Sequence, residues 1–206
     1  MGQPLHQTGL GARQIDARDP YLGESEFPGQ GLNTSNEWMA DDHLPIVETK
    51  KTQKASRTLH WRSEDDTAAF ARALAAAPVL RDAFVALHGD LGAGKTTFVR
   101  HLLRALGVHG RIKSPTYAVV EPYVLPDGTE VSHFDFYRFE DPREWEDAGF
   151  RDIFAGPGLK LAEWPEKAAG LLPVCDLRLD LQVDIETEAR SVAAQALSPH
   201  GEALLR

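Results

Sequence analysis

The chain has 206 residues, only one cysteine, and no long apolar run. Cys175 has no partner in the chain, which excludes an internal disulfide and a zinc site built from several cysteines. No apolar stretch approaches the roughly 20 residues that a membrane-spanning helix needs, and the N-terminal region has no continuous apolar signal core. These absences predict a cytoplasmic protein without a membrane partner.

Positive charge is also scarce, with 22 Lys and Arg against 31 Asp and Glu, so the net charge is −9. This balance argues against a broad surface for nucleic acid or anionic membranes and leaves only a local basic patch. If the function involves RNA, we therefore expect another protein to hold it.

Two regions differ in composition. Residues 1–56 are rich in Gly, Pro, Gln, Ser and Asp and show neither helical nor strand periodicity, which predicts a disordered N-terminal extension. Residues 57–206 carry the periodic apolar segments of one globular domain.

The stretch from Phe84 to Thr97 reads FVALHGDLGAGKTT and holds the most informative motif. An apolar run typical of a buried strand leads into a glycine-rich loop, and apolar residues at helical spacing follow. The loop fits G-x-x-x-x-G-K-[S/T], whose backbone N–H groups bind phosphate, whose lysine reaches the outer phosphates and whose hydroxyl completes Mg²⁺ coordination. The predicted ATP-binding residues are Gly89, Asp90, Leu91, Gly92, Ala93, Gly94, Lys95, Thr96 and Thr97.

Two β-rich runs flank the turn sequence Pro126-Asp127-Gly128, which predicts a hairpin. In its second strand the period of two places His133, Asp135 and Tyr137 on one face and Arg138 on the other. The later segment VCDLRLDLQVDI predicts an antiparallel strand with one solvated face. Its expected inward residues are Cys175, Leu177, Leu179, Leu181, Val183 and Ile185. The whole pattern predicts an α/β, three-layer P-loop NTPase fold whose mixed central sheet includes antiparallel strands.

A phosphate loop also needs an acidic group near the metal and a group that positions the attacking water or hydroxyl. Glu163 ends the apolar run LKLAE in the manner of a Walker B strand, and Asp135 lies in the polar-faced strand. Such a face more often meets solvent than a ligand. Ser114-Pro115-Thr116 lies where switch segments that sense the γ-phosphate occur in other loop NTPases, or it is an ordinary turn.

Five segments, GDLGAGKTTF, SPTY, HFDFYR, DAGFRDIF and AEWPEKA, occur in this order and resemble the TsaE (YjeE) family. That family is the bacterial ATPase component of the system that makes threonylcarbamoyladenosine, t(6)A, in tRNA. The resemblance covers about Thr58 to Ile185. The chain departs from the family at Tyr117, where Phe is common, and in its long N-terminal extension.

The resemblance implies a Mg²⁺-dependent ATPase that supports turnover of the TsaB–TsaD transferase complex and meets tRNA through those partners. By resemblance, Lys95 and Thr96 bind phosphate and Mg²⁺, Glu163 assists Mg²⁺, Asp135 positions water or metal, and Thr116 belongs to the switch-like segment. The catalytic candidates are Asp135, Glu163 and Thr116, and the metal-binding candidates are Thr96 and Glu163. Because we find no arginine directed at the γ-phosphate, we expect slow hydrolysis without partners.

Three other functions are open to a phosphate-loop protein. A GTPase would carry an N-K-x-D segment, but the only asparagines, Asn33 and Asn36, precede the predicted domain. A small-molecule kinase usually has an arginine-bearing lid, for which no convincing segment lies between Arg138 and Glu163. A nucleotide-gated binding module would use ATP only to set its binding state.

Overall fold

The computed structural model describes residues 55–206. The predicted disordered extension, residues 1–56, therefore lies outside the described residues except for Ala55 and Ser56. Ser56 already belongs to the first strand, so the ordered domain begins slightly ahead of the expected start at residue 57.

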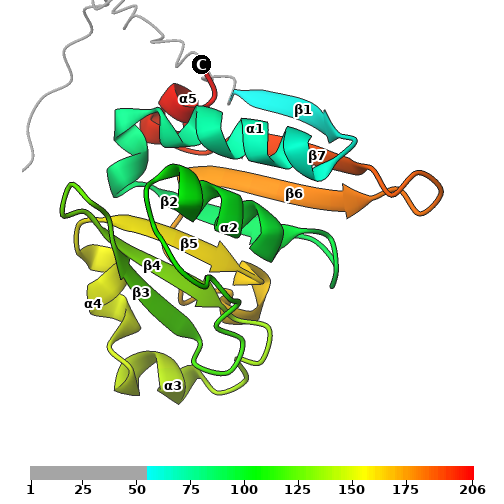
Figure 1. The fold of residues 1–206 in the computed structure, drawn as a ribbon. Helices are drawn as coiled ribbons and strands as arrows, with labels where there is room; N and C mark the ends of the chain where they lie inside the picture. The colour runs from blue at the N-terminus through cyan, green and yellow to red at the C-terminus, as the bar shows by residue number, and fades with distance from the viewer. Residues whose placement is uncertain (1–54) are drawn as a thin grey trace, which may run out of the picture. The chain divides into compact units, whose positions relative to one another are not determined.

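One seven-stranded sheet forms the centre of the domain (Figure 1). Its strands, in spatial order, are β1 (Ser56–Trp61), β7 (Arg190–Ala196), β6 (Leu177–Val183), β2 (Phe84–His88), β5 (Leu159–Glu163), β4 (Glu130–Asp135) and β3 (Val120–Val124). The four central strands from β6 to β4 are parallel, whereas β1, β7 and β3 pair antiparallel with their neighbours. The predicted mixed α/β sheet and the hairpin β3–β4 are confirmed.

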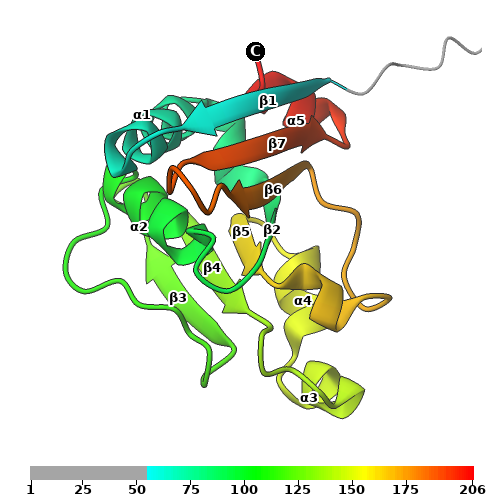
Figure 2. The ribbon, with the colours of Figure 1, turned by 90° about the vertical axis from the view of Figure 1, so that its right-hand side faces the viewer.

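Helices cover both faces of this sheet, and Figure 2 shows α1 and α2 on the side opposite α3 and α4. The helices are α1 (Glu64–Ala75), α2 (Lys95–Ala105), α3 (Pro142–Asp147), α4 (Phe150–Ala155) and α5 (Pro199–Leu204), with short 3₁₀ helices η1 (Pro78–Asp82) and η2 (Pro165–Ala168). Two apolar clusters fill the layers. Alternation in β2 explains them, because Val85 and Leu87 pack on the α1/α2 side while Phe84 and Ala86 pack on the other.

Local signals set the helix boundaries. The hydroxyl of Ser63 accepts a hydrogen bond from the Asp66 amide and caps α1. Gly149 adopts a left-handed φ of 67° and separates α3 from α4. Asp141 caps the first of these helices by accepting from the Arg143 amide.

The strand β6 differs from the expectation in two ways. It pairs antiparallel with β7 as predicted, but parallel with β2. Cys175, Leu177, Leu179 and Leu181 are buried, whereas Val183 and Ile185 are 40% and 93% exposed. The strand ends at Val183, and the chain then turns back toward β7, so the alternation continues past the edge of the apolar core.

Candidate functional site

The glycine-rich loop joins β2 to α2 and requires glycine at Gly89 and Gly94. Their φ angles are 133° and 102°, and a Cβ on Gly89 would lie 2.3 Å from the carbonyl oxygen of Leu181. These positions explain the spacing of the two outer glycines, since any other side chain would strain or displace the loop. The loop ends at the first turn of α2, where backbone N–H groups and the helix dipole favour an anion.

Lys95 is the cation at the centre of this loop. Its side chain is buried, and its ammonium donates to the carbonyl oxygens of Gly89 and Asp90. The same ammonium lies 3.9 Å from the centre of the Trp164 ring. Burial lowers the pKa of Lys95, and the nearby carboxylates, Glu163 first among them, oppose that shift.

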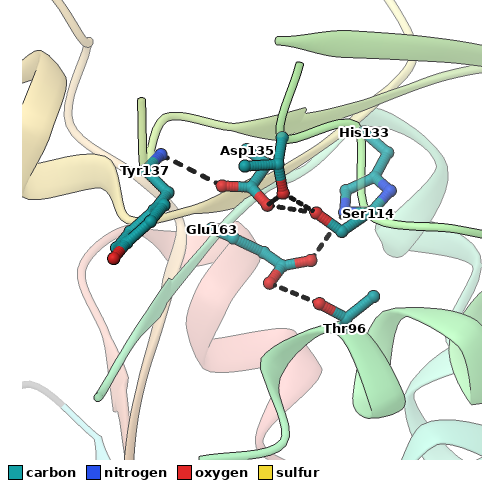
Figure 3. A network of polar contacts seen from close by, with 7 residues as sticks. Thr96, Ser114, His133, Asp135, Tyr137 and Glu163 are labelled. Carbon is teal, nitrogen blue, oxygen red and sulfur yellow. Dashed lines mark hydrogen bonds and ion pairs between the residues drawn. The ribbon is translucent and has the colours of Figure 1, made fainter. Parts of the chain in front are cut away.

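Glu163 lies at the carboxyl end of β5, beside the first turn of α2 (Figure 3). One carboxylate oxygen accepts from the Thr96 hydroxyl at 2.8 Å, and the other lies 2.9 Å from Nε2 of His133. His133 is fully buried in β4, and its Nδ1 has no hydrogen-bond partner among the described residues. A carboxylate only accepts, so Nε2 of His133 is the donor in this contact.

Asp135 lies at the carboxyl end of the neighbouring strand β4. One of its oxygens accepts from the hydroxyls of Ser114 and, at 2.8 Å, Thr116 (Figure 3 shows the Ser114 and Tyr137 contacts). The other accepts from the Tyr137 amide at 3.0 Å. These donors fix the orientation of the carboxylate and connect the switch-like segment to the sheet.

A cavity of about 520 Å³ brings these groups together. The predicted residues that line it are Leu91, Gly92, Gly94, Lys95, Thr96, Thr97, Thr116, Asp135 and Glu163. The carbonyl oxygens of Gly89 and Asp90 accept hydrogen bonds from Lys95, which lines the cavity. Ala93 is buried in the apolar core. The face that carries His133 and Asp135 is buried rather than solvated, since His133 contacts the Glu163 side chain and Asp135 contacts Ser114 and Thr116.

The expected position of Arg138 is wrong. Strand β4 ends at Asp135, so the alternation that would turn Arg138 to the opposite face stops before it. Arg138 instead lines the same cavity as Lys95 and Asp135, and its guanidinium stacks 4.6 Å from the centre of the Tyr117 ring. The chain therefore does bring an arginine to the cavity.

Ser114 and Trp164 were not among the predicted site residues, and both line the cavity. A signal for Ser114 existed, since Ser114 and Thr116 are two residues apart in one short segment and can direct both hydroxyls at one carboxylate. Trp164 lies in AEWPEKA, one of the segments that carry the family resemblance, and its left-handed φ of 56° directly after Glu163 is part of the turn into η2.

The sequence was compared with known proteins. The family model described as "Threonylcarbamoyl adenosine biosynthesis protein TsaE" matches residues 61–192. The chain belongs to the TsaE family. The TsaE proteins of Haemophilus influenzae and Bacillus subtilis are 42% and 38% identical to it over 121 and 122 residues. These matches span 59% and 57% of this chain and 75% and 73% of the relatives.

A solved structure agrees with this assignment. The crystal structure of YdiB from Bacillus subtilis superposes with a TM-score of 0.55 and 26% identity, over 74% of this chain and 93% of that one. The TsaE-family domain thus has an α/β P-loop NTPase-like fold and belongs to the t(6)A biosynthesis pathway. Among residues 55–206, no helix is long and apolar enough to cross a membrane.

Proposed function

We propose that this TsaE-family chain binds ATP with Mg²⁺ and hydrolyses it. The contact that carries the proposal is the 2.8 Å hydrogen bond between Thr96, the hydroxyl residue of the phosphate loop, and Glu163, the carboxylate that ends β5. This hydrogen bond brings together the two predicted metal ligands, which are 67 residues apart in the sequence. Lys95, buried beside them, supplies the positive charge for the outer phosphates.

The oxygen atoms at this position fit Mg²⁺. A hydroxyl and a carboxylate are hard ligands, and Mg²⁺ commonly takes one or two protein groups and completes its octahedron with phosphate oxygens and water. In the described part of the chain, no group of three or more His, Cys, Asp or Glu residues is arranged to hold a metal by itself. A protein site of only two oxygens therefore favours an ion that arrives with the nucleotide, where it would neutralise phosphate charge.

Each residue that lines or supports the cavity then has its own role in ATP hydrolysis. The loop amides and Lys95 orient the phosphates, while His133 holds the Glu163 carboxylate toward Thr96. Asp135 accepts from Ser114 and Thr116 and lies in the same cavity, so its carboxylate is suited to position the attacking water. Arg138, also in the cavity, is a candidate for stabilising charge on the transferred phosphoryl group.

We further propose that hydrolysis supports turnover of the TsaB–TsaD transferase complex and that tRNA is held mainly through those partners. We propose that these partners act on hydrolysis through the segment from Ser114 to Tyr117. Thr116 bonds Asp135 inside the cavity, while Tyr117, 85% exposed, stacks on Arg138 at its mouth. A partner that contacts Tyr117 would move two groups that face the phosphates, and so would act mainly on kcat.

Single-turnover ATP hydrolysis tests this function. The purified chain is mixed with ATP at several Mg²⁺ concentrations, alone and with TsaB, TsaD and tRNA. We expect Mg²⁺-dependent binding, slow hydrolysis by the chain alone, and a larger kcat with partners. Absence of ATP binding would overturn the proposal, and transfer of the phosphoryl group to a small molecule instead of water would indicate a kinase.

A further inference from the structure

The segment that follows the phosphate loop has an unusual charge balance. Residues 91–120 contain Lys95, Arg100, Arg104, Arg111 and Lys113 but no Asp or Glu, in a chain whose net charge is −9. Arg111 and Lys113 are exposed in the connection between α2 and β3. Arg111 and Lys113 both line one surface hollow, whereas Lys95 is buried in the phosphate loop.

These two cations also lack partners within the described part of the chain. No hydrogen bond or ion pair links Arg111 or Lys113 to another group within residues 55–206. Elsewhere in the same part of the chain, Arg81, Arg143 and Arg178 each pair with an aspartate at 2.6–3.0 Å. With no counter-ion among residues 55–206, this exposed pair of cations can neutralise an external anion.

The basic groove is the surface hollow of about 330 Å³ lined by Arg111, Lys113, Tyr117, Glu121 and Tyr123. Tyr117 is 85% exposed even though the Arg138 guanidinium stacks on its ring, so most of the aromatic surface is accessible. Tyr123 is half-buried in the same groove. Glu121 is the one carboxylate in it.

We propose that the basic groove binds single-stranded RNA. Cations alone would suit any polyanion, but an exposed aromatic ring beside them fits a ligand that carries both phosphates and unstacked bases. An acidic protein segment offers no comparable set of flat faces for Tyr117, and a paired duplex hides its bases. Contact through two cations gives weak binding.

Fluorescence anisotropy with a labelled 12-nucleotide uridine-rich RNA tests the proposal on the full chain. We expect a Kd on the order of 10⁻⁵ M at moderate salt and a slope of log K against log [salt] of about −1.4. The double variant Arg111→Gln, Lys113→Gln should weaken binding about tenfold or more. Its matched control, Arg72→Gln with Lys167→Gln, removes one exposed arginine and one exposed lysine elsewhere and should bind as the wild type does.

The aromatic contribution is tested separately. Tyr117→Ala should weaken RNA binding at least about fivefold, while Tyr117→Phe should keep most of it. A duplex of equal length and a polyglutamate peptide are the competing ligands. No RNA binding by the wild type, unchanged binding by the double variant, or equal binding of polyglutamate would overturn the proposal. ATP affinity is measured on the same samples and should be unchanged in the double variant. Absence of ATP binding by the wild type would count against the proposed function and not against the RNA site.

Discussion

Asp135 and Glu163 lie opposite each other in the parallel pairing of β4 and β5, both at the carboxyl ends of their strands. Their contacts differ, because Glu163 accepts from Thr96 of the phosphate loop whereas Asp135 accepts from Ser114 and Thr116 of the switch-like segment. Two neighbouring carboxylates thus face different parts of one cavity. This separation predicts that their substitutions will have different kinetic effects.

Replacing Lys95 with Ala should sharply reduce ATP binding, because it removes the buried ammonium at the centre of the loop. A charge-assisted contact contributes about 1.5–3 kcal/mol, so the Kd should rise about 10- to 150-fold or more. Titration calorimetry measures this change, circular dichroism should stay near that of the wild type, and Lys167→Ala is an exposed control. Unchanged nucleotide affinity would rule out the loop assignment.

Asp135→Asn should keep ATP binding and lower kcat about 10²- to 10⁴-fold. The amide preserves the shape that Ser114 and Thr116 contact, but it carries no charge and accepts a proton poorly. Single-turnover hydrolysis separates this effect from binding, with the exposed Asp147→Asn as control. Normal hydrolysis by the variant would mean that Glu163 or a partner, and not Asp135, positions the attacking water.

His133→Phe should raise the Mg²⁺ concentration needed for half-maximal hydrolysis. The ring keeps the volume but removes the donor to Glu163, and loss of a hydrogen bond to a charged group costs about 1.5–3 kcal/mol of stability. His133→Gln retains an N–H donor and should restore part of the Mg²⁺ response. Equal Mg²⁺ dependence in all three proteins would mean that His133 only fills space.

Gly89→Ala should destabilise the fold more than Gly128→Ala. Both glycines have positive φ, but a Cβ at Gly89 meets the Leu181 carbonyl whereas one at Gly128 has nothing within 4 Å. Strain alone costs about 1–2 kcal/mol at Gly128, and displacement of the β6 backbone adds to it at Gly89. Urea unfolding compares the two variants, and equal losses would contradict the close approach of the loop to β6.

Thr116→Ala should reduce the stimulation of hydrolysis by TsaB and TsaD more than the rate of the chain alone. Ser114 still donates to Asp135 in the variant, so the carboxylate keeps one of its two hydroxyl partners. The ratio of kcat with and without partners is the measurement, and Thr129→Ala is the control. An equal fall in both rates would show that Thr116 acts only within the cavity.

Local patterns in the amino-acid sequence determined the phosphate loop and the β3–β4 hairpin, and the order of five segments determined the family. The loop and the hairpin each depend on residues within about 20 positions of one another, where glycine spacing and hydrophobic period act directly. Only the tertiary structure decided that His133 and Asp135 are buried, that Arg138 reaches the cavity, and that Val183 and Ile185 are exposed. Those outcomes depend on which strands lie side by side and on where each strand ends. The order of the strands determines which side chains are covered. Because β4 ends at Asp135, Arg138 no longer follows the alternation of the strand and can line the cavity.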